Sequence, residues 1–139
     1  MQFDHEKLDV YQLELKLIAW VSILLGEVSE QRGRRVAEVC DQLDRASLSS
    51  LLNTAEGNGK RQRLVRAKFF DDARGSATES AACLDALVAK QACSMERVAP
   101  GKEFLIRIVS ILTKLVTKFE ADPGDAGTLR EEPPDYRND

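Results

Sequence analysis

The stretch NTAEGNGKRQR, residues 53–63, decides how the chain folds back on itself. Two glycines flank Asn58, and a glycine in the left-handed conformation commonly ends an α-helix. Helical patterns of apolar residues lie on both sides of this stretch. We therefore predict that one helix ends at Gly57 or Gly59, and that a second helix, basic at its start, runs back beside the first.

The two segments that flank this turn carry apolar and small residues at the spacing of one helix face. In residues 34–56 they are Val36, Val39, Cys40, Leu43, Ala46, Ser47, Leu51 and Leu52. In residues 61–91 they are Phe70, Ala73, Ala77, Ala81, Leu84, Leu87 and Val88. Because its alanine side chains are small, the second stripe predicts close approach of a neighbouring helix, to which Gly75 and Ser76 contribute.

The first segment, residues 4–29, has the same helical period. Its stripe consists of Val10, Leu17, Val21, Leu24 and Val28, with Tyr11, Ile18 and Leu25 beside it. Leu13, Leu15 and Trp20 are expected to lie outside this stripe. The apolar arc is therefore wider than one core contact requires, which predicts a second buried surface on this helix.

The last helical segment covers residues 100–120. Its apolar residues are Phe104, Leu105, Ile108, Val109, Ile111, Leu112, Leu115, Val116 and Phe119. Pro100 suits the first turn of a helix, where its missing N–H has no intrahelical partner. Ser94 is a candidate start for one extra turn before it.

Four amphipathic segments joined by short loops, with no segment that alternates like a strand, predict an all-α protein. The expected architecture is an antiparallel, up-down-up-down four-helix bundle over residues 1–120. Residues 121–139 are rich in proline, glycine and acidic residues. We expect them to form a disordered acidic C-terminal tail.

The composition is that of a single soluble domain, with 139 residues, a net charge of −3 and a hydrophobic fraction of 43%. No apolar run approaches the roughly 18 residues of a membrane helix. The N-terminus MQFDHEKLDV lacks the pattern of an export signal, so we expect a cytoplasmic protein. Cys40, Cys83 and Cys93 are then expected to be reduced thiols packed in or near the core.

Residues with catalytic or metal-binding chemistry are few. A phosphate-binding loop would need a glycine and a hydroxyl at positions where this chain has Thr54 and Arg61. His5 is the only histidine, so a histidine-activated nucleophile and a di-iron bundle site both lack their required residues. We predict no enzyme activity, no metal and no cofactor.

A basic patch is the cluster that suggests binding. Residues 60–74 carry a net charge of +4, from six basic and two acidic side chains. Residues 60, 63 and 66 nearly share one face at helical spacing. The patch is either a contact for nucleic-acid phosphates or an ordinary solvated helix face. The candidate nucleic-acid-binding residues are Lys60, Arg61, Arg63, Arg66 and Lys68.

Arg74, the sixth basic residue of this stretch, also has a structural interpretation. In a hairpin centred near Asn58 and Gly59, Arg74 lies level with Asp44. We therefore expect an ion pair between Arg74 and Asp41 or Asp44 that joins the second and third helices.

Three sequence motifs occur in order along the chain. The first is FDHEKLDVYQ at residues 3–12, the second is N-x-A-E-G-N-G-K at residues 53–60, and the third is F-x-x-x-A-R-G-S-A-x-E at residues 69–79. In this combination the chain, from about residue 3 to residue 119, resembles the four-helix bundle family of 23S rRNA intervening-sequence proteins. The matching motif residues include Asn53, Glu56, Gly57, Gly59, Arg74, Gly75, Ser76 and Glu79. Their expected roles are helix capping, close helix approach and polar contacts between helices.

The resemblance implies a bundle that assembles into a homopentameric ring and is encoded in or associated with rRNA intervening sequences. More distantly, the chain resembles the accessory proteins of diversity-generating retroelements, which bind nucleic acid and a reverse transcriptase. We therefore expect a ribosome-associated protein that binds RNA or a ribonucleoprotein through the basic patch. The alternative is an oligomeric scaffold that binds another protein and no nucleic acid.

The chain departs from the family's pattern S-I-P-x-N-I-A-E-G at the end of the second helix. Ser50 and Thr54 stand where the family has isoleucine. A hydroxyl in place of an apolar side chain is expected to weaken the packing of this segment.

Overall fold

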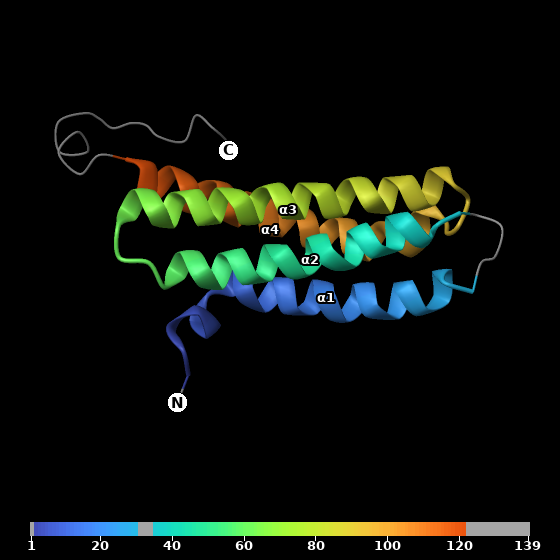
Figure 1. The fold of residues 1–139 in the computed structure, drawn as a ribbon, viewed down its shortest axis with the longest axis horizontal. Coiled ribbons are helices and arrows are strands. Elements are labelled where there is room, and N and C mark those ends of the chain that lie inside the picture. Colours follow the sequence, from blue (N-terminus) through green and yellow to red (C-terminus); the bar gives the residue numbers. More distant parts are fainter. Residues whose placement is uncertain (1, 31–34, 122–139) are drawn as a thin grey trace.

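The computed structural model describes residues 2–30 and 35–121. These residues form four long helices and a short 3-10 helix, and they contain no strand. The elements are η1 (Asp4–Lys7), α1 (Asp9–Val28), α2 (Ala37–Asn58), α3 (Arg63–Ala89) and α4 (Met95–Glu120). Successive long helices run in opposite directions along one elongated bundle (Figure 1). The predicted all-α, up-down-up-down four-helix bundle is confirmed.

Each long helix packs against two others. Helix α2 packs on α3 and α3 packs on α4, while α1 closes the bundle by packing on both α2 and α4. Every helix contributes at least one fully buried aliphatic side chain to the core, such as Leu17, Leu43, Leu84 and Ile108. Burial of a side chain of this size contributes roughly 1.5–3 kcal/mol, so the apolar stripes are the main source of stability.

The apolar stripe of α1 is buried as predicted, but the prediction that Leu13 lies outside this stripe is wrong. Leu13 also belongs to the core, with 5% of its surface exposed. It lies three residues after Val10 and four before Leu17, which places all three on one face of the helix. Leu15 remains 40% exposed. The arc of α1 therefore includes apolar surface that the described residues leave uncovered.

The turn between α2 and α3 differs from the predicted left-handed glycine cap. Gly57 lies inside α2, and Gly59 caps the helix with φ −85° and ψ −7°, in the right-handed region. Gly57 is buried, and a Cβ on it would lie 3.0 Å from Cβ of Phe69 and 3.3 Å from the carbonyl oxygen of Arg66. Gly57 is therefore required for the close approach of α2 and α3 rather than for the turn.

The connection between α3 and α4 uses a left-handed residue that is not glycine. Gln91 has φ 63°, and it follows the last turn of α3. The N–H of Ala92 donates to the carbonyl of Leu87, and the N–H of Gln91 donates to that of Val88, both at 2.9 Å. This pattern is a Schellman motif, which satisfies carbonyl groups at the end of the helix.

Helix α4 begins earlier than predicted. Ser94 is its N-cap, and its Oγ accepts a hydrogen bond from the N–H of Arg97 at 3.0 Å. The expected extra turn is therefore continuous with the helix, and Pro100 lies in the second turn rather than the first. The cap stabilises the added turn by roughly 1 kcal/mol, which helps to offset the N–H that Pro100 lacks.

Some predictions fall outside the described residues. The predicted disorder of residues 122–139 in the acidic tail is among them, so the division into a bundle and a tail stays a prediction. Within the described ranges, none of the helices combines the length and the apolar character needed to cross a membrane.

Candidate functional site

The predicted basic patch lies at the end of the bundle where α2 turns into α3 and where α4 ends (Figure 1). Lys60 and Arg61 belong to the connecting loop, whereas Arg63, Arg66 and Lys68 lie on the first turns of α3. The prediction that residues 60, 63 and 66 share one helix face is wrong, because α3 begins only at residue 63.

The side chain of Arg66 has a structural role. Its Nη1 donates to the carbonyl oxygens of Asn58 at 3.1 Å and of Lys60 at 2.9 Å, and its Nη2 donates to Oδ1 of Asn58 at 3.1 Å. Its guanidinium lies over the ring of Phe119, 4.6 Å from the centroid. Arg66 therefore binds the end of α2, the loop and the end of α4 together. These contacts use both N–H groups of Nη1 and one of Nη2, and Nε is buried without a hydrogen-bond partner among the described residues.

Arg63 has a similar structural role at the end of α4. Its Nη1 donates to the carbonyl oxygens of Phe119 and Glu120, each at 3.2 Å. The last carbonyls of a helix have no intrahelical partner and carry a partial negative charge. Arg63 therefore caps α4 from the first turn of α3.

The lysines of the patch are paired at the surface instead. Nζ of Lys60 lies 3.0 Å from Oε2 of Glu56, and Nζ of Lys68 lies 3.1 Å from Oδ2 of Asp72. Both ammonium groups also lie near the ring of Phe69, at 5.3 and 5.7 Å from its centroid. Ion pairs this exposed contribute only about 0–1 kcal/mol, so a phosphate group can replace the carboxylate.

The predicted patch thus divides into two groups. Arg63 and Arg66 close the bundle, while Lys60, Arg61 and Lys68 present their charge to solvent. We call Lys60, Arg61 and Lys68 the basic rim.

Polar side chains join α2 to α3, as expected for several of the motif residues. The hydroxyls of Ser49 and Ser76 are hydrogen-bonded at 2.9 Å, and Nδ2 of Asn53 donates to the carbonyl and to Oγ of Ser49. Nε2 of Gln42 donates to Oε2 of Glu79. The expected inter-helix contacts of Ser76 and Glu79 are therefore present.

Gly75 differs from the expectation for this motif. A Cβ built on Gly75 meets nothing within 4 Å, and the residue is exposed on α3. No other helix approaches Gly75 closely within the described part of the chain.

The predicted ion pair of Arg74 with Asp41 or Asp44 is wrong. Nη2 of Arg74 binds Oδ1 of Asp71 on its own helix, and its Nη1 lies 3.4 Å from the hydroxyl of Thr113 on α4. Arg74 therefore points toward α4 rather than α2.

The reason is the register of the hairpin. The hydrogen-bonded pairs Ser49–Ser76 and Gln42–Glu79 place the centre of the hairpin after Lys60, beyond the predicted centre near Asn58 and Gly59. The residues that lie level with Arg74 on α2 are consequently closer to the turn than Asp44.

A buried carboxyl group on α1 is a feature that the sequence analysis missed. Glu14 has no exposed surface, and its Oε2 accepts hydrogen bonds from Oγ of Ser50 at 2.6 Å and from Oγ1 of Thr54 at 2.8 Å. Burial raises the pKa of Glu14 from its ordinary value of 4.5 to about 7, although both hydrogen bonds act to lower it. We call Glu14, Ser50 and Thr54 the acid cluster.

The sequence did contain a signal for this cluster. The predicted stripe of α1 steps from Val10 to Leu17, and Glu14 fills the missing position at helical spacing. Ser50 and Thr54 are also the two residues that depart from the family's apolar pattern. They are buried and hydrogen-bonded to a carboxyl group of α1. Their hydroxyls therefore form a polar contact at the place where weaker packing was expected.

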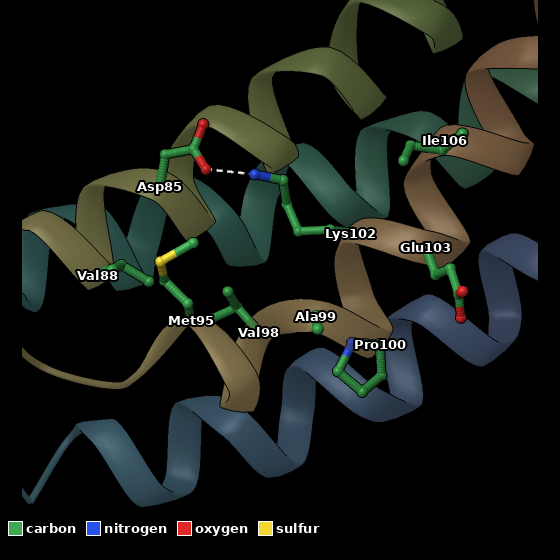
Figure 2. Close-up of a pocket in the computed structure, with 9 residues that line it drawn as sticks. All are labelled: Asp85, Val88, Met95, Val98, Ala99, Pro100, Lys102, Glu103 and Ile106. Carbon is green, nitrogen blue, oxygen red and sulfur yellow. Dashed lines mark hydrogen bonds and ion pairs between the residues drawn. The ribbon is translucent and has the colours of Figure 1, made fainter.

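A groove lies between the end of α3 and the start of α4, as Figure 2 shows. Its volume is about 560 Å³. An ion pair between Lys102 and Asp85 crosses it, and Met95 and Ile106 are 72% and 67% exposed. The lining residues are Asp85, Val88, Met95, Val98, Ala99, Pro100, Lys102, Glu103 and Ile106. The groove offers apolar surface between charged side chains, and its lining includes no histidine, cysteine or hydroxyl nucleophile.

The three cysteines are free thiols. Cys83 is buried, and Cys40 and Cys93 are half-buried against the core. Burial raises the pKa of each thiol above its ordinary value, so these residues pack as small apolar groups and are poor nucleophiles. Within residues 2–30 and 35–121, no group of three or more His, Cys, Asp or Glu side chains could hold a metal ion.

Comparison with known proteins gives one match. The family model described as 23S rRNA-intervening sequence protein matches residues 6–114. No curated protein and no solved structure matches the chain. The family match covers α1, α2 and α3 completely and most of α4. The chain therefore belongs to the 23S rRNA-intervening sequence protein family.

Proposed function

We propose that the protein is a non-enzymatic, oligomeric bundle that is encoded in or associated with rRNA intervening sequences and contacts RNA or a ribonucleoprotein through its basic rim. The observation that carries the RNA contact is the group of solvent-facing cations at one end of the bundle, in a member of a family named for an rRNA element. In this proposal the protein works in the cytoplasm, near the ribosome, without a metal or a cofactor.

The geometry of the rim suits phosphate rather than base recognition. Lys60 and Arg61 lie on a loop and Lys68 lies on the next turns of α3, so their charges follow the end of the bundle. Flexible cations of this kind bind the phosphate backbone without reading sequence. Arg66 supports the contact indirectly, because it holds the loop that carries Lys60 and Arg61.

The proposed oligomer is supported by apolar residues on the outer face of α1. Leu15, Ala19 and Ile23 recur every four residues, and all three are exposed, Ile23 by 63%. We call them the outer stripe. On α2, Leu48 and Leu52 are also 47% and 55% exposed. Contact of these faces with other copies of the chain would provide the second buried surface, and the family resemblance makes the pentamer the expected assembly.

Fluorescence anisotropy with labelled 23S rRNA fragments at low salt tests the RNA contact. We expect the triple variant Lys60→Glu, Arg61→Glu and Lys68→Glu to lose most binding. In a plot of the logarithm of the association constant against the logarithm of the salt concentration, the line should become less steep by about 2 if three phosphate contacts are lost. A triple variant at exposed basic residues elsewhere, Lys16→Glu, Arg107→Glu and Lys114→Glu, has the same net charge and serves as the control.

Two outcomes would contradict the RNA contact. One is that the wild-type protein binds no rRNA fragment at low salt. The other is that both triple variants weaken binding equally, because that result would show a general effect of net charge and no role for the rim.

The second candidate function is a protein-interaction scaffold, which the apolar groove of Figure 2 favours. Met95 and Ile106 expose apolar surface there that a partner could cover. A protein that co-purifies with the chain after nuclease treatment, and that is lost in Met95→Glu and Ile106→Glu, would support this function in place of RNA binding.

A further inference from the structure

Glu14 is an acidic side chain in the interior of an otherwise apolar helix interface. It lies on the inward face of α1 between Val10 and Leu17, which are 1% and 0% exposed. Its two partners, Ser50 and Thr54, lie one turn apart on α2 and are also fully buried. Apart from these two hydrogen bonds, the described side chains form no other that joins α1 to α2.

The carboxyl group is only partly satisfied. Both hydroxyls donate to Oε2, whereas Oε1 is buried and has no hydrogen-bond partner among the described residues. A buried carboxylate is stable only when a cation or several donors compensate it. Two neutral donors on one oxygen leave half of the carboxylate charge without compensation.

No neighbouring charge contributes to the raised pKa of Glu14: burial raises it, and the hydrogen bonds from Ser50 and Thr54 lower it. From α2 the facing groups are the hydroxyls of Ser50 and Thr54, and neither its other buried residues nor those of α4 can ionise. Helix α3 buries one titratable group, the thiol of Cys83, whose pKa is raised mainly by burial and further by Glu79 and Cys40. On α1, Glu14 is itself the only buried charged residue.

We propose that the acid cluster is a proton-dependent latch, in which protonated Glu14 holds α1 against α2 and loss of its proton loosens α1 from the bundle. When α1 separates, Glu14 reaches water and ionises at its ordinary pKa of 4.5, whereas in the docked helix its pKa is raised to about 7. The docked state therefore retains the proton more strongly. Its stability is greatest below pH 4.5, falls as the pH rises toward 7, and levels off above 7.

Helix α1 is suited to such a device because few polar contacts hold it. At its other end, Arg97 of α4 binds Glu27 through Nε and Nη2, at 2.7 and 3.1 Å, but this pair is largely exposed. The ring of Trp20 also lies under Arg97, 5.4 Å from its guanidinium, and the ring of Tyr11 lies 4.8 Å from that of His5, while the core face of α1 is apolar packing. Glu14 is the charged side chain that α1 buries completely in this face, so its protonation bears directly on how tightly α1 is held.

Amide hydrogen exchange tests the latch in the full-length protein. After correction for the intrinsic pH dependence of exchange, the opening equilibrium of α1 should rise about tenfold from pH 6 to pH 8. In Glu14→Gln, which keeps the shape and cannot ionise, the opening of α1 should not change with pH. Glu79→Gln is the control, because Glu79 also accepts a hydrogen bond from α2 but is exposed. It should behave like the wild type.

If Glu14→Gln does not fold, NMR titration of the Glu14 carboxyl group tests the latch instead. The ¹³C chemical shift of the Glu14 carboxyl should titrate with a midpoint near 7 in the wild type. In the double variant Ser50→Ala and Thr54→Val the midpoint should move to higher pH, because donors that favour the carboxylate are removed. A wild-type midpoint near 4.5, or equal pH dependence of α1 exchange in the wild type and Glu14→Gln, would overturn the proposal.

Discussion

Gly101 shows how strongly a single residue can constrain two helices. A Cβ on Gly101 of α4 would lie 2.3 Å from the Cζ3 atom of Trp20 on α1, and two further ring atoms lie within 2.8 Å. These distances are below any normal contact, and the indole ring cannot yield as a flexible side-chain end would. Gly101 therefore permits the half-buried ring of Trp20 to pack directly against the backbone of α4.

We predict that Gly101→Ala destabilises the protein by about 1–3 kcal/mol, because the added methyl group forces Trp20 out of place. Gly75→Ala is the matched control, since Gly75 also lies inside a helix but has open space around it. In that variant alanine should stabilise α3 by about 0.5–1 kcal/mol through its higher helix propensity. Urea unfolding measures both values, and equal changes in the two glycine variants would contradict this account.

At the scale of the elements, helix ends and their connections depend on arginine side chains that come from another helix. Arg66 of α3 binds the last carbonyl of α2 and a carbonyl of the loop, and Arg63 binds the last turn of α4. Helices α2 and α4, which end here, are thus capped by side chains of α3 as well as packed against it. The register of α2 against α3 follows from the same contacts and from the close approach at Gly57.

We expect Arg66→Gln to destabilise the protein by about 1.5–3 kcal/mol, because charge-assisted hydrogen bonds to half-buried carbonyls are lost. Arg61→Gln removes the same charge from the exposed loop and should change stability by less than about 0.5 kcal/mol. Chemical unfolding compares the two variants. Equal stability of the two variants would show that the hydrogen bonds of Arg66 do not stabilise the folded protein, and its structural role would be wrong.

At the scale of the whole molecule, the four helices bury one stripe each and leave apolar residues on the outside. On α1 and α2 the large exposed apolar side chains are Leu15, Ile23, Leu48 and Leu52. Scattered exposed apolar residues are normal on a monomer. An apolar stripe that repeats along one helix is instead typical of a face that is buried against another helix.

We predict that the protein forms oligomers through this face. Multi-angle light scattering should give a mass that is a multiple of the chain mass, with five copies expected, and the double variant Leu15→Glu and Ile23→Glu should shift it toward a single copy. Circular dichroism should show that the variant remains helical. Leu64→Glu, an exposed leucine at the start of α3, is the control and should leave the mass unchanged. A monomeric wild-type protein would refute the prediction.

The sequence by itself determined the number of helices, their order and their antiparallel arrangement. Periodic apolar stripes and short loops are local patterns, and they bury one face of each helix whatever the neighbouring helix contains. The same local reasoning found Ser94 as a helix start and located the turn between α2 and α3 within residues 53–63, although it placed the centre of the turn too early. It also located the basic residues at that turn.

Only the tertiary structure decided what those residues do. Arg63 and Arg66 are basic like Lys60, but they reach carbonyl groups on other helices, whereas Lys60 forms a surface ion pair with Glu56. Arg74 faces α4, and Glu14 accepts hydrogen bonds from two hydroxyl groups on α2, 36 and 40 residues away along the chain. Such partners depend on helix register and on which side chains meet across an interface, and no local pattern contains that information.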